Sequence, residues 1–182
     1  TITLHLVNND EINGQVSGDG WTVQLLAFKT VKNATSFGTG KHSVVLSANA
    51  DSSTTASSGD SYGTMTLNKN GNIQWTGVLP DGSKGSEKSA LSKDGVWPLY
   101  SSLYGGNGSL IGWLQVTNGS SDIGGSVIWV APANPNGLYP NGLTNKLDAA
   151  GSDLNSSAGV PQKTLVLSGP QLSGPLTNNV TL

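Results

Sequence analysis

Apolar and polar residues alternate along much of this chain, in short segments that are separated by glycine turns. Four such turns follow one another at 69–71, 80–82, 93–95 and 105–108. Alternation with a period of two places successive side chains on opposite faces of a β-strand, and Asn-Gly or Asp-Gly pairs between alternating segments favour tight reversals. The pattern therefore predicts an antiparallel β-meander.

The first three segments illustrate the pattern. Residues 2–8, 11–16 and 21–27 alternate, and the pair Asp19-Gly20 predicts a two-residue turn that places Val16 opposite Val23. We expect these segments to form three strands with a single apolar face. The third strand contributes the following residues to that face: Trp21, Val23, Leu25 and Ala27.

The later turns predict a register. A turn at 69–71 pairs Leu67 with Ile73 and Met65 with Trp75. Pairing Tyr104 with Ser109 places six apolar residues on one side of the next hairpin, which supports that register. The expected pairs are Leu103 with Leu110, Leu99 with Leu114, and Trp97 with Val116, and Tyr100 then lies opposite Trp113 on the other side.

Three segments fit the meander less well. Residues 83–91 would turn Glu87 toward the core, so we interpret them as a charged edge strand. Residues 49–60 are rich in Ser, Thr and Ala and predict an exposed loop, and 132–162 predicts a long irregular excursion. The expected fold is a single all-β domain over 1–182, an antiparallel meander of ten to twelve strands that closes into a barrel or a flattened β-sandwich.

The amino-acid composition of the chain excludes several kinds of partner and site. The chain of 182 residues has nine Lys, no Arg, no Cys and a net charge of −2. Without Arg it lacks the usual bidentate ligand of guanine and phosphate, so we expect no nucleic-acid partner. The apolar runs are far shorter than the ~20 residues of a membrane helix, so we expect no membrane insertion. The absence of Cys excludes disulfides and thiolate metal sites.

The chain contains few residues of the types that usually form catalytic sites. The chain has two histidines, His5 and His42, and neither lies in a recognisable nucleophile motif, so we expect both to be ordinary surface residues. Asp19, Asp81 and Asp94 each precede a glycine, where a turn-forming role is sufficient. The acidic and amide side chains of 8–11 lack the spacing of a calcium loop. We therefore expect no catalytic residues, no metal and no cofactor.

Aromatic side chains offer one candidate binding site. In the register above, Tyr100, Tyr104 and Trp113 project from the face opposite the leucines. Rings held on a rigid sheet suit stacking against sugar faces, with a hydroxyl or indole N–H free to hydrogen-bond. Alternatively, the 132–162 segment packs over these rings and makes a second core. The remaining tryptophans share strand faces with aliphatic residues, which favours a core position for each of Trp21, Trp75, Trp97 and Trp129.

The order of several short motifs resembles a known kind of domain. The runs 59–64, 70–73, 77–82 and 91–95, followed by Trp97-Pro98-Leu99-Tyr100 and Gly112-Trp113, are similar to an uncharacterised β-barrel-type domain of large secreted or surface proteins of verrucomicrobia-like bacteria. Further runs at 14–17, 139–145 and 165–169 extend the resemblance over most of the chain. It implies an extracellular, multidomain and non-catalytic setting, and it carries no site residues.

We therefore expect a non-enzymatic structural or adhesion module of a larger surface protein or fibre-like assembly, located outside the cell or at a bacterial cell surface. Its expected partners are neighbouring domains or identical subunits, because strand-like sequence occurs at both ends of the chain. One alternative is a carbohydrate-binding module that binds polysaccharide through Tyr100, Tyr104 and Trp113. A hydrolase is a further alternative, and it requires a pocket that gathers a histidine, an acid and a serine.

Overall fold

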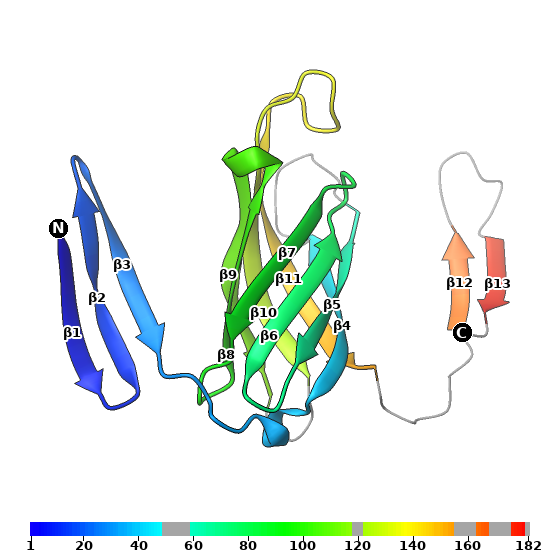
Figure 1. The fold of residues 1–182 in the computed structure, drawn as a ribbon. Helices are drawn as coiled ribbons and strands as arrows, with labels where there is room; N and C mark the ends of the chain where they lie inside the picture. Colours follow the sequence, from blue (N-terminus) through cyan, green and yellow to red (C-terminus); the bar gives the residue numbers. More distant parts are fainter. Residues whose placement is uncertain (49–58, 118–121, 155–162, 168–175, 181–182) are drawn as a thin grey trace.

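The structure, a computed structural model, describes residues 1–48, 59–117, 122–154, 163–167 and 176–180. Its strands form three antiparallel sheets (Figure 1). The first sheet consists of β1 (Ile2–Asn8), β2 (Glu11–Gly18) and β3 (Trp21–Phe28). The second consists of β4 (Gly40–Ala48), β5 (Ser61–Leu67), β6 (Asn72–Val78), β7 (Lys84–Ala90), β8 (Val96–Leu103), β9 (Gly108–Val116), β10 (Ile123–Ala131) and β11 (Leu143–Asp153). A hairpin of β12 (Lys163–Leu167) and β13 (Leu176–Val180) forms the third.

The eight-stranded sheet is an up-and-down barrel with one open seam. Each strand from β4 to β7 pairs with the next, as does each strand from β8 to β11, and β11 pairs with β4. The two edges of the sheet, β7 and β8, then lie side by side without a backbone ladder (Figure 1). Here the Oγ of Ser101 on β8 accepts a hydrogen bond from the amide of Ser86 on β7 and donates one to its carbonyl, both at 3.2 Å. The expected antiparallel meander closing into a barrel is confirmed.

The barrel interior is filled by side chains, as expected for eight strands. The six apolar residues expected on one side of the 97–116 hairpin are all buried. Leu67 pairs with Ile73 and Met65 with Trp75, as predicted. The largest fully buried side chains include three of the four tryptophans expected in the core, Trp75, Trp97 and Trp129.

The predicted pairing across the 105–108 turn is wrong by two residues. Leu103 pairs with Gly108 and Trp97 with Leu114, because a 3-10 turn at η2 (Tyr104–Gly106) continues the reversal to Asn107. Tyr104 has a φ of 52°, in the left-handed region that only glycine adopts readily. A slip of two residues preserves the faces of a strand, so the side chains of β8 and β9 still point to the expected sides, whereas Tyr104 lies in the turn and not in a strand.

Residues 132–162 are not one irregular excursion. The 11 residues of β11 lie within this range and pair with both β10 and β4, and the described loop before this strand spans 132–142. The alternation of β11 was difficult to see in the sequence, because its inward side chains include only one large apolar residue. Its buried side chains are Asn145, Leu147 and Ala149. Residues 83–91 contain the edge strand β7, as predicted. The loop expected over 49–60 lies almost entirely outside the described residues.

The three-stranded sheet lies beside the barrel (Figure 1). Its register is the predicted one, with Val16 opposite Val23. In the same register Gly14 lies opposite Leu25. Its apolar face is not a core, however, because nothing among the described residues covers it. Trp21 is 52% exposed, so the expectation of a core position is wrong for this tryptophan.

Candidate functional site

Two of the three proposed platform rings lie on the outer surface of the barrel. Tyr100 on β8 is 56% exposed and Trp113 on β9 is 47% exposed. Tyr100 pairs with Ile111, which pairs with Ile128 on β10, so three exposed apolar side chains cross three strands in one row. Tyr100 and Trp113 share this face of the sheet but are not directly opposite one another, because the register differs from the predicted one.

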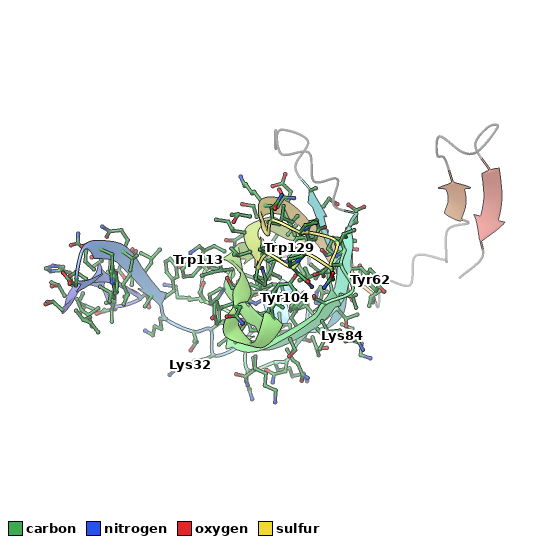
Figure 2. All side chains as sticks on the ribbon, turned by 90° about the horizontal axis from the view of Figure 1, so that it is seen from above. Lys32, Tyr62, Lys84, Tyr104, Trp113 and Trp129 are labelled. Atoms are coloured by element: carbon green, nitrogen blue, oxygen red, sulfur yellow. The ribbon has the colours of Figure 1, made fainter. Side chains whose placement is uncertain are left out.

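Trp113 faces the three-stranded sheet (Figure 2). Its ring meets that of Phe28 edge-on, with centroids 5.7 Å apart. Beside it lies a cleft of about 650 Å³ whose opposite wall is the polar face of β1–β3. That wall presents hydroxyl, imidazole and amide groups: Thr3, His5, Asn13, Gln15 and Gln24. The cleft therefore combines an aromatic ring with hydrogen-bonding side chains, the combination that sugar binding uses.

Ion pairs lie at the turn between β1 and β2. Asp10, in the turn between β1 and β2, pairs with Lys29 at 3.1 Å and with Lys93 in the turn before β8. The hydrogen bond from Lys93 and then that from Lys29 lower the pKa of the Asp10 carboxyl. Through its pair with Lys93, Asp10 joins the sheet to the barrel. Among the described residues, no group of three or more His, Asp or Glu side chains could hold a metal ion.

Tyr104 does not share the outer face with Tyr100 and Trp113, and lies at one end of the barrel seam (Figure 2). Its hydroxyl donates to Asp81 Oδ2 at 2.6 Å and accepts from the indole Nε1 of Trp129 at 3.1 Å. Asp81 also accepts from the amide and hydroxyl of Ser83, both at 2.9 Å. Burial, and then the bond to Asp81, raise the pKa of Tyr104 to about 12. This network ties the β6–β7 turn to β10 across the end of the seam.

The loop at 132–142 lies over this end of the barrel. Its Tyr139 packs edge-on against Trp129, with centroids 5.2 Å apart. A cavity of about 280 Å³ separates the loop from the Asp81 and Tyr104 side chains. Burial, and then the charge of Asp81, raise the pKa of Tyr139. The loop therefore covers Tyr104 and leaves Tyr100 exposed, so the rings do not form the second core considered above.

A row of glycines crosses the opposite half of the barrel. Gly63, Gly77 and Gly85 are paired neighbours on β5, β6 and β7. On the inner side, the indole of Trp75 lies against all three. On the outer side they line a groove of about 490 Å³, which Tyr62 and Lys84 also line. Both side chains are exposed and point away from the barrel (Figure 2).

The two histidines lie in different environments. His5 is exposed, as expected, and lines the cleft beside Trp113. The expectation of a surface position is wrong for His42, which is fully buried on β4 with no hydrogen-bond partner for either ring nitrogen among the described residues. His42 stands two and four residues before Val44 and Leu46, which are also buried, so the period-two pattern of β4 is the signal that could have indicated its burial. The described part of the chain contains no helix of the length and hydropathy that a membrane span needs.

Comparison with known proteins gives no relative: no family model, no curated protein and no solved structure matches this chain.

Proposed function

We propose that this chain is a non-enzymatic structural or adhesion module of a larger bacterial surface protein or extracellular fibre-like assembly. The observation that carries the proposal is the uncovered apolar face of β1–β3. The polar face of this sheet is turned toward the barrel, and the apolar face is turned away from it. Five large side chains on that face are 52% to 71% exposed: Ile2, Leu4, Leu6, Trp21 and Val23.

This face is a candidate interaction surface. The largest apolar patch on a soluble monomer is typically about 300–600 Å² and is often functional. Ordinary surfaces scatter such side chains singly, whereas here the pairs Ile2–Val16 and Val16–Val23 place them in continuous rows across three strands. The packed barrel supplies a rigid support for this surface, which is what a module joined to neighbours requires.

Sedimentation velocity tests the proposal. We expect the wild-type chain to associate as its concentration rises, and the double variant Leu4→Glu/Val23→Glu to remain monomeric. The matched control is Thr3→Glu/Gln24→Glu, which adds the same charges to the same strands on the polar face. It should associate as the wild type does. A wild-type chain that stays monomeric at every concentration would contradict the proposal.

The cleft beside Trp113 favours one second function, binding of carbohydrate. The half-exposed indole forms one wall and amide and hydroxyl side chains form the other. We expect Trp113→Ala to abolish binding on a glycan array, and Gln24→Ala to weaken it. Tyr100→Ala serves as the control for the exposed row outside the cleft. Equal binding by Trp113→Ala and the wild type would remove this function.

A further inference from the structure

Two small sheets lie on either side of the barrel in the sequence. The N-terminal sheet has three strands and an uncovered apolar face, and the C-terminal hairpin has two strands that pair only with each other among the described residues. A two-stranded hairpin is at best marginally stable alone in water. From this juxtaposition we infer that β12–β13 of a second copy completes β1–β3 into a closed five-stranded barrel. The inference rests on the proposed function and names the partner.

Strand edges support this closure. The three-stranded sheet has two outer edges, β1 and β3, and the described residues add to them only the isolated bridge from Thr30 to Ser92. The hairpin also has two edges. Joining the edges of one to those of the other leaves no unpaired strand, and closure into a barrel is the arrangement that removes exposed edges. Five strands are enough for a small barrel.

The faces support it as well. Closure turns the apolar face of β1–β3 inward, where its exposed side chains become a core. In the register of the hairpin, Leu167 stands opposite Leu176, Leu165 opposite Asn178 and Lys163 opposite Val180. Four of these six positions are apolar, and the outer edges of the hairpin supply the backbone groups that closing strands need.

The size of the face shows that face-to-face contact alone is not sufficient. Strands of seven or eight residues, with a rise of ~3.4 Å and a spacing of ~4.8 Å, give a face of about 350 Å² in projection. Stable interfaces bury about 800 Å² on each partner. Strand pairing at two edges adds backbone hydrogen bonds to the contact between the faces.

The contact is head-to-tail, since the sheet of one copy takes the hairpin of the next. Figure 1 shows the sheet and the hairpin on opposite sides of the barrel. Each added copy therefore presents a new free hairpin or sheet. A heterologous contact of this kind produces open filaments unless its rotation closes a ring.

Two variants of the 182-residue chain, each blocking one of the two sheets, test the inference. Leu4→Glu/Val23→Glu charges the sheet face and leaves the hairpin intact. Val166→Pro/Thr177→Pro removes two backbone donors at one cross-strand pair of the hairpin and leaves the sheet intact. Circular dichroism and tryptophan fluorescence check that the barrel folds in both, because no tryptophan lies in the hairpin.

We expect each variant alone to be monomeric, with an association constant reduced by at least about tenfold. An equimolar mixture should form dimers and nothing larger, because the intact hairpin of one fills the intact sheet of the other. Association of the proline variant alone, equal to that of the wild type, would overturn the hairpin as the partner and leave the proposed function standing. A monomeric wild type would overturn both.

Discussion

The glycine row beneath Trp75 offers a direct test of how the barrel is packed. A Cβ added at Gly77 would lie 2.5 Å from Cζ2 of the Trp75 indole and 3.1 Å from the carbonyl oxygen of Tyr62. An ordinary contact begins near 3.4 Å, so the ring must move by almost 1 Å within a closely packed interior. Overpacking of this kind costs about 1–3 kcal/mol. Alanine also restricts the unfolded chain, which offsets about 0.4–1 kcal/mol. We therefore expect Gly77→Ala to lower the free energy of unfolding by about 1–2 kcal/mol.

Urea unfolding followed by tryptophan fluorescence measures this change. The matched control is Gly124→Ala on β10, where an added Cβ meets no atom within 4 Å. This variant should be as stable as the wild type or slightly more stable. Replacing Trp75 by leucine should remove most of the penalty of Gly77→Ala, because the two sites are in contact and their effects are not additive. If Gly77→Ala and Gly124→Ala are equally stable, the indole does not lie on the glycine row and the reasoning is refuted.

Two further predictions concern the barrel seam. Burial raises the pKa of the Glu87 carboxyl on β7 to about 7, above its usual value of 4.5. The folded state therefore binds this proton more tightly than the unfolded state does. As a result, the free energy of unfolding falls as pH rises from 4.5 through 7. In urea unfolding, Glu87→Gln should have the same free energy of unfolding as the wild type at pH 4. At pH 8 its free energy of unfolding should be higher by about 1 kcal/mol, a figure discounted for partial exposure. A constant difference at both pH values would contradict the assigned pKa. Tyr104→Phe removes the bonds to Asp81 and Trp129 and should cost about 1.5–3 kcal/mol of unfolding free energy, whereas the exposed Tyr100→Phe should cost less than about 0.5 kcal/mol. Equal stability of the two phenylalanine variants would show that the network does not hold the seam.

The local pattern was sufficient to predict most strands and their faces. The residues at Leu99, Leu103, Leu110 and Leu114 are buried as expected, because a two-residue alternation depends only on strand geometry. The register across 105–108 could not be predicted from this alternation. It depends on the backbone of Tyr104, which adopts a positive φ that no residue preference predicts.

Tertiary arrangement explains the other differences. The apolar face that contains Trp21 was predicted, but alternation does not say whether another layer covers such a face. The sequence indicates a turn-forming role for Asp81, and the hydrogen bond that its carboxylate accepts from the backbone amide of Ser83 agrees with that role. Its bond to Tyr104 joins residues 23 positions apart, and no local signal indicates such a contact. The cleft beside Trp113 was missed for the same reason, since its two walls come from different sheets.

Amide hydrogen exchange of residues 1–28 at low and high protein concentration tests the central claim most directly. If the apolar sheet joins a neighbouring copy, amides of β1 and β3 should exchange more slowly at high concentration, while those of the barrel strands β9 and β10 keep their rates. Identical exchange of β1 and β3 at both concentrations would contradict the account, because the sheet would then remain uncovered.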